Sequence, residues 1–175
     1  AGTVLDNLVS LVDVYPTLLE CAGRERFTAG LDGHSLLPLI RGEESAHPDW
    51  VFSEYHDTTC NTGVFMLRQG AWKYVAYPGF ASQLFNLDDD PGELKSLIRE
   101  QPERAEQMDM RLRSIVNIEA VDAEVKAYDK DSFRRWRAAA KVAGIYESEM
   151  ARIHSGFDRM DADDANPQPW TEADE

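Results

Sequence analysis

The sequence predicts an α/β protein whose 175 residues take an α+β form, a four-stranded antiparallel sheet packed on a long helix. Four short segments rich in aromatic and β-branched residues follow one another between residues 50 and 87, which indicates the sheet. Apolar residues at three- and four-residue spacing come next and indicate the helix. A strand-to-helix pattern precedes both, like the last unit of an α/β layer whose other strands lie elsewhere.

Residues 1–45 are expected to form that strand–helix unit. In "NLVSLVDVYPTLLECAG" a short apolar strand runs into a helix, with Ser10 and Asp13 as a cap-like pair at its start and Gly23 at its end. Pro16 is tolerated only in a first helical turn. "GLDGHSLLPLI" is expected to be a Gly-rich loop with a short helical turn.

Residues 46–118 are expected to form the sheet and its helix. The strand segments are "WVFSEY", "VFMLR", "WKYVAY" and "SQLFNL", with a hairpin turn at Gln69-Gly70-Ala71. Pro102 opens a helix that continues to about Asn117 and should cover one face of the sheet. Its apolar stripe consists of Ala105, Met108, Leu112, Ile115 and Val116.

A helical extension is expected in residues 119–157 and an acidic flexible tail in residues 158–175. Within the extension we expect a helix from Asp131 to about Ala143, with Phe133 and Trp136 on one side.

The stretch "QLFNLDDDPGEL" is rich in acids and invites comparison with a calcium loop. Counted from Asn86, such a loop needs Gly where Pro91 stands and Glu where Leu97 stands, so its most demanding positions fail. We expect instead a strand end, a tight turn and a helix start, with Asp90 as the cap and Glu93 reaching back to it.

Composition excludes some classes of partner. The net charge of -14 argues against nucleic acid, and no apolar run approaches the ~20 residues that span a bilayer. Cys21 and Cys60 form no metal-binding pattern, and Cys21, on the apolar face of its helix, is expected to be a buried thiol. His34, His47 and His154 are scattered and fit no ligand spacing.

The best candidate site is "SEYHDTTCNTG", a polar loop from His56 to Gly63 between two apolar strands. A two-residue turn would suffice there, so the longer loop is either a binding element or an ordinary surface loop with Asx turns. The candidate substrate-binding residues are His56, Asn61 and Thr62. A second candidate, Trp72-Lys73-Tyr74, is either a ligand platform or strand packing with Lys73 pointing to solvent.

Several segments in their order, "VSLVDVYPTLLECAG", "GLDGHSLLPLI", "MLRQGAWKYVAY" and "QLFNLDDDPGEL", resemble the C-terminal third of sulfatases, in the alkaline phosphatase superfamily. The resemblance runs from about Leu8 to Arg137. Its later part, "LRSI", "V-x-A-x-V-x-x-Y" and "F-x-x-W", lies outside what most sulfatases share and resembles a subgroup that acts on 2-O-sulfated uronic acid.

The resemblance implies a sulfate ester hydrolase in which residues 1–45 end a large α/β domain. The family uses calcium and a formylglycine made from Cys or Ser in a C/S-x-P/A-x-R motif. Cys21 is followed by Gly23 and Glu25 where that motif needs Pro or Ala and then Arg. We therefore expect no catalytic residue and no metal ligand within this chain, which should be inactive without an upstream portion of the same protein.

The resemblance implies a sulfated sugar of glycosaminoglycans as substrate and leaves a homo-oligomer open. Family members are periplasmic, secreted or lysosomal, and the sequence does not choose among these. His56 and Asn61 would donate hydrogen bonds to a sugar hydroxyl or a uronate carboxylate. Two alternatives remain: a phosphate or phosphonate monoester hydrolase of the same superfamily, and a non-catalytic module that binds glycan or protein.

Overall fold

The computed structural model describes residues 2, 4–43, 45, 47–57 and 60–157. The chain divides into two compact units, one made of Ala1–Tyr55 and Val64–Val116 and the other of His56–Gly63 and Asn117–Glu175. The expected tail, residues 158–175, lies outside the described residues.

The N-terminal region of the first unit is helical. It contains a 3-10 helix at Leu11–Asp13 (η1), the helix α1 at Val14–Cys21, a second 3-10 helix at Glu25–Phe27 (η2) and the short helix α2 at Leu37–Arg41. The strand expected before α1 does not form, because residues 4–10 have extended backbone but no partner strand among the described residues. The helical turn expected in "GLDGHSLLPLI" is confirmed as α2.

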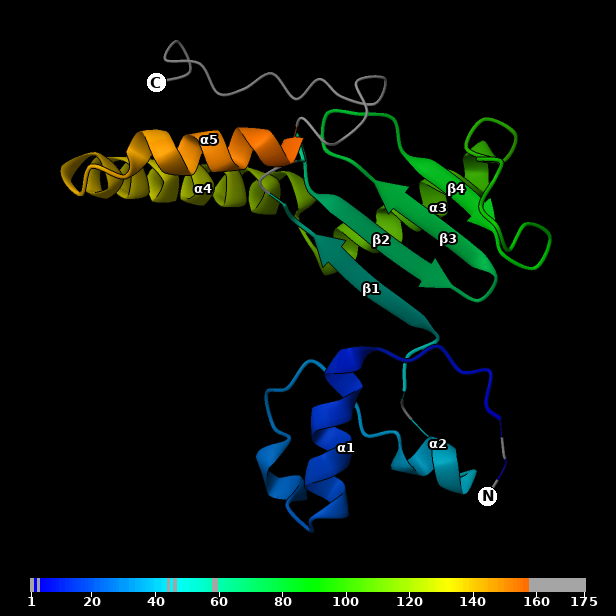
Figure 1. Ribbon diagram of the computed structural model, residues 1–175. Coiled ribbons are helices and arrows are strands. Elements are labelled where there is room, and N and C mark those ends of the chain that lie inside the picture. The colour runs from blue at the N-terminus through cyan, green and yellow to red at the C-terminus, as the bar shows by residue number, and fades with distance from the viewer. Residues whose placement is uncertain (1, 3, 44, 46, 58–59, 158–175) are drawn as a thin grey trace. The chain divides into compact units, whose positions relative to one another are not determined.

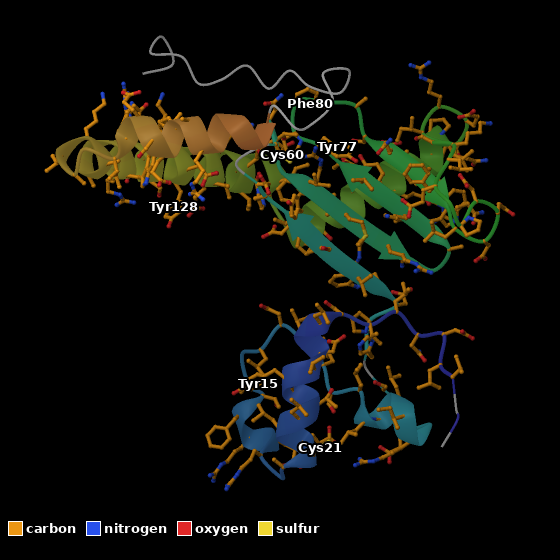
Figure 2. The ribbon with its side chains drawn as sticks, in the orientation of Figure 1. Tyr15, Cys21, Cys60, Tyr77, Phe80 and Tyr128 are labelled. Atoms are coloured by element: carbon orange, nitrogen blue, oxygen red, sulfur yellow. The ribbon has the colours of Figure 1, made fainter. Side chains whose placement is uncertain are left out.

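The expected ends of α1 are confirmed. The backbone N–H of Ser10 donates to Asp13 Oδ2 at 2.7 Å, and Gly23, with a φ of +64°, follows the last turn. The prediction that Cys21 is buried is wrong, since its thiol is exposed at the end of α1 (Figure 2). Pro16 is the buried residue of α1, and Cys21 lies about 140° around the helix from it.

The sheet has the predicted strands in the simplest order. β1 (Trp50–Tyr55), β2 (Val64–Gln69), β3 (Trp72–Ala76) and β4 (Gln83–Asn86) pair antiparallel in the order β1-β2-β3-β4 (Figure 1). Gln69 pairs with Trp72, so the hairpin turn is Gly70-Ala71, and Gly70 supplies the positive φ that a two-residue turn requires.

The predicted helix is α3 (Pro102–Ile115), which crosses one face of the sheet (Figure 1). Its buried residues are Ala105, Met108 and Leu112, as the stripe predicts. Alternate positions of the strands supply the other half of this core, because successive strand residues point to opposite faces. These are Phe65, Leu67, Tyr74, Ala76 and Leu84. Full burial of each large apolar side chain contributes about 1.5–3 kcal/mol.

The acid-rich stretch is a turn and not a helix start, so that prediction is wrong. The Asp90 carboxylate accepts the backbone N–H of Lys95 at 2.9 Å, and this contact lowers the pKa of Asp90. Glu93 has a φ of +54°, which no α-helix contains. Its carboxylate binds Lys73 Nζ at 2.7 and 2.8 Å instead of reaching back to a cap.

The second unit contains two helices, α4 (Ile118–Val142) and α5 (Tyr146–Phe157), which contact each other (Figure 1). α4 begins at Ile118 rather than at the expected Asp131, because Asn117 caps it by accepting the N–H of Ala120 at 3.1 Å. The expected side of Phe133 and Trp136 is confirmed, since their ring centroids lie 5.6 Å apart.

α5 was not predicted. The Trp136 ring also meets Tyr146 of α5, with centroids 5.9 Å apart, and so joins the two helices. None of the described helices combines the length and apolar character that crossing a membrane requires.

Candidate functional site

The polar loop between β1 and β2 belongs to the same compact unit as α4. His56, Asp57 and residues 60–63 of this loop are described, while Thr58 and Thr59 lie outside the described residues. The described part is neither strand nor helix, and the N–H of Cys60 closes a turn on the carbonyl of Asp57 at 3.0 Å.

Asp122 of α4 holds the end of this loop. Its Oδ1 accepts the backbone N–H of Gly63 at 2.7 Å and faces the Thr62 hydroxyl at 3.4 Å. Its Oδ2 accepts from Lys126 Nζ at 2.7 Å, one helical turn away. Asp122 is 7% exposed, so these contacts replace most of the water that would solvate its charge.

The electrostatics favour an ionised Asp122. Burial raises the pKa of its carboxyl, but contacts with the Lys126 ammonium, the Gly63 N–H and the Thr62 hydroxyl outweigh burial, and the pKa lies below its usual value. The anchor is therefore a charge-assisted hydrogen bond near neutral pH.

A cavity of about 20 Å³ lies between the loop and α4, room for about one water molecule. It is lined by His56, Asp57, Cys60, Thr62, Gly63, Asp122, Val125, Lys126 and Asp129, and Figure 2 labels Cys60. A sugar does not fit in this space. The cavity is thus the packed underside of the loop, and a ligand would have to meet the loop from outside.

The three predicted binding residues are placed differently. His56 and Thr62 line the cavity, and the Nε2 atom of His56 is shielded from solvent. Asn61 does not line the cavity and is exposed. Sequence reasoning missed Asp122 and Lys126, although an acid followed four residues later by a lysine is a typical pair within a helix.

Trp72, Lys73 and Tyr74 do not form one platform. Tyr74 is buried on the α3 side of the sheet, and the Arg104 guanidinium lies 5.3 Å from the centre of the Trp72 ring. Lys73 lies on the opposite face and pairs with Glu93. These residues serve strand packing, and Lys73 is bound to a carboxylate rather than simply pointing to solvent.

Two of the histidines expected to be scattered lie close together. The rings of His34 and His47 are 5.8 Å apart, and both residues bind the buried Asp13. Asp13 Oδ1 accepts the His34 backbone N–H at 2.8 Å, and Oδ2 lies 3.1 Å from His47 Nε2. His47 Nδ1 lies 3.1 Å from the carbonyl oxygen of Pro48.

This Asp13 cluster joins α1 to two loops. Gly33 makes the approach possible, because a Cβ added there would collide with the Val12 carbonyl. Burial raises the pKa of Asp13, but the N–H groups of His34 and Ser10 and the His47 ring outweigh burial and lower it. The contacts are all made within the protein, and the cluster is structural.

A metal centre is not formed by the described residues, which bring no three His, Cys, Asp or Glu side chains together in a way that could hold an ion. The described side chains therefore do not fit the calcium and formylglycine that sulfatases use, and neither group is assigned to them.

Comparison with known proteins identifies the family. The family model described as "N-sulphoglucosamine sulphohydrolase, C-terminal" matches residues 1–120. Arylsulfatase K of Xenopus laevis is 40% identical over 163 residues, covering 87% of this chain and 30% of the relative. Human arylsulfatase K is 42% identical over 163 residues, with the same two shares. The chain thus spans less than a third of the length of these relatives.

A solved structure supports the fold. The phosphonate monoester hydrolase of Agrobacterium radiobacter superposes with a TM-score of 0.54 at 24% identity, over 65% of this chain and 26% of that chain. The expected arrangement of an antiparallel sheet and helices is thereby confirmed as that of this superfamily. The chain belongs to the C-terminal domain family of sulfatases, and arylsulfatase K is among its relatives.

Proposed function

We propose that this chain is the C-terminal portion of an enzyme that hydrolyses sulfate esters. The observation that carries the proposal is the identity of 40% and 42% with arylsulfatases K across 87% of the chain. Because the chain covers 30% of those relatives, the nucleophile, the calcium ligands and the sulfate-binding residues belong to the remaining part of the protein. Calcium would stabilise charge on the sulfuryl group there.

The proposed substrate is a 2-O-sulfated uronic acid of a glycosaminoglycan. The likeness to arylsulfatase K supports this, since it covers 87% of the chain and so continues past residue 120, where the family model ends. The loop His56–Gly63 is the proposed substrate-contacting element. A uronoside offers hydroxyl and carboxylate oxygens, which are acceptors for amide and imidazole N–H groups.

Each loop residue has a distinct proposed role. Asn61 is exposed and presents its amide to the sugar. His56 contacts the substrate through its ring and supports the loop from the cavity side. Thr62 directs its hydroxyl hydrogen toward Asp122, which leaves lone pairs on the oxygen to accept from a sugar hydroxyl.

An apolar surface supports the proposal that more of the protein packs on the N-terminal region. Between residues 4 and 18 the exposed large apolar side chains are Val4, Leu5, Val9, Leu11, Val12, Val14, Tyr15 and Leu18. Such a run on a protein surface indicates an interface. The remaining part of the same protein is the proposed partner, and the chain alone is proposed to be inactive.

The test uses the complete gene product that contains this chain. Turnover of a 2-O-sulfated uronoside is compared with that of phosphate and phosphonate monoesters. We expect the sulfate ester to give the larger kcat/KM. Faster turnover of a phosphate or phosphonate would contradict the proposal and favour the other hydrolases of the superfamily.

A second measurement separates the enzyme from a non-catalytic module. The isolated chain should neither hydrolyse a sulfate ester nor remain a monodisperse monomer, because its apolar surface is open. A monomeric, cooperative melt together with glycan binding by the isolated chain would favour the module.

A further inference from the structure

The loop His56–Gly63 needs a restraint that the sheet does not provide. Tyr55 and Val64 are the last paired residues of β1 and β2, so the loop leaves the sheet directly after a strand pair. A long loop without further contacts pays its full ordering entropy each time it meets a ligand. Contacts that hold it beforehand would improve binding without touching the ligand.

α4 supplies such a contact through one carboxylate. Asp122 Oδ1 accepts the N–H of Gly63, and Gly63 is buried, so removal of the carboxylate leaves a buried donor unsatisfied. Lys126 holds the other oxygen, which fixes the orientation of the carboxylate. The Asn117 cap fixes the start of the helix that carries both residues.

The position of α4 in the sequence gives this contact a meaning. The family model ends at residue 120, before Asp122, while the likeness to arylsulfatase K covers 87% of the chain and so runs through α4. The loop is thus held by an element outside the part that defines the family. A feature carried by some members is suited to substrate choice rather than to the chemistry that all members share.

We infer that Asp122 is a positioning residue, and that α4 sets substrate selectivity by presenting the loop His56–Gly63 to the sugar. The inference rests on the proposed function and extends it. Asp122 acts through Gly63 and Thr62 and makes no contact with substrate. The class of substrate read by the loop is a sulfated uronoside rather than a small aryl sulfate, which has no sugar ring to contact.

The experiment compares Asp122→Ala and Asp122→Asn in the complete gene product with the wild type. The measured quantity is the ratio of kcat/KM for a 2-O-sulfated uronoside to kcat/KM for 4-nitrophenyl sulfate. Asp122→Ala should lower this ratio about tenfold, mainly through a higher KM for the uronoside. Asp122→Asn should recover much of the ratio, because its amide oxygen still accepts the N–H of Gly63.

Asp131→Ala is the matched control, since Asp131 lies further along α4, is 61% exposed at its side chain and pairs with Arg135. This variant should leave the ratio unchanged. An equal ratio in Asp122→Ala and wild type overturns the inference, as does a failure of Asp122→Asn to exceed Asp122→Ala.

Amide hydrogen exchange at Gly63 separates this inference from the proposed function. Asp122→Ala should exchange at least about tenfold faster there, whereas Asp131→Ala should match the wild type. If the wild-type protein hydrolyses no sulfate ester, the proposed function fails, and unchanged exchange at Gly63 would then overturn the positioning role as well.

Discussion

The phenol of Tyr74 donates to Asp109 Oδ1 at 2.9 Å, which joins β3 to α3 at the edge of the main core. Burial raises the pKa of Tyr74, and Asp109 adds to the shift through its negative charge. The same Asp109 binds the Arg113 Nε at 2.7 Å through its other oxygen, so the pair is part of a short polar network.

Tyr74→Phe should lower the free energy of unfolding by about 0.5–1.5 kcal/mol, because the ring stays packed while one hydrogen bond is lost. Chemical denaturation at neutral pH measures this. Tyr77→Phe is the control, since Tyr77 makes an exposed hydrogen bond to Gln83 and should cost less than about 0.5 kcal/mol. Equal effects in the two variants would contradict the buried role of Tyr74.

Alkaline pH should weaken the fold through the same residue. A tyrosine whose folded pKa is raised contributes stability that is present below its unfolded pKa of about 10 and is lost as pH rises through the folded value. The wild type should therefore lose more stability than Tyr74→Phe between about pH 9 and 11. Parallel curves for the two proteins would show that Tyr74 does not titrate with the fold.

Acid should loosen the N-terminal region through Asp13. Its folded pKa is depressed, so its contribution is present above the unfolded value of 3.8 and is lost as pH falls through the folded one. Asp13→Asn should cost about 1–3 kcal/mol at pH 7 and less below about pH 3. Hydrogen exchange at the His34 amide, which donates to Asp13, reports the change locally.

Glu20→Gln is the control for Asp13→Asn, because Glu20 makes a solvent-exposed ion pair with Arg41 at 3.3 Å. Exchange at His34 should be unaffected in this variant. An Asp13→Asn protein with the same stability gap at pH 7 and pH 3 would rule out the titration.

Replacement of loop residues should affect binding rather than stability. In the complete gene product, His56→Ala and Asn61→Ala should each reduce kcat/KM for the uronoside by the equivalent of ~1–3 kcal/mol, with Tm unchanged for Asn61→Ala. Ser114→Ala, at an exposed position of α3, is the control. Wild-type kinetics in both loop variants would leave the loop as a connection only.

The backbone at Glu93 can be tested with a pair of variants. Glu93→Gly and Glu93→Ala both remove the ion pair with Lys73, so their difference reports the φ of +54°. Glycine adopts this conformation freely, and alanine pays about 1 kcal/mol. Glu93→Ala should therefore be less stable than Glu93→Gly by that amount in urea denaturation, and the reverse order would contradict the left-handed backbone.

The sheet and α3 were predictable because their signals are local. Alternating apolar residues and a glycine two residues before Trp72 indicate strands and a hairpin wherever they occur. The start of α4 was missed because charged residues separate the apolar positions in its first turns. The Asp122 contact was beyond prediction, since Gly63 and Asp122 lie 59 residues apart and the sequence carries no sign of their meeting.

The acid-rich turn has a consequence for the outer side of β4, the last strand of the sheet. Beyond Asp90 the chain doubles back along that strand, so that the N–H of Leu84 donates to Ser96 Oγ at 3.2 Å and its carbonyl accepts the N–H of Leu97 at 2.7 Å. These are the groups through which another chain would add a strand. The turn therefore guards this border against intermolecular β-pairing, and mutations that open it should promote aggregation before they unfold the core.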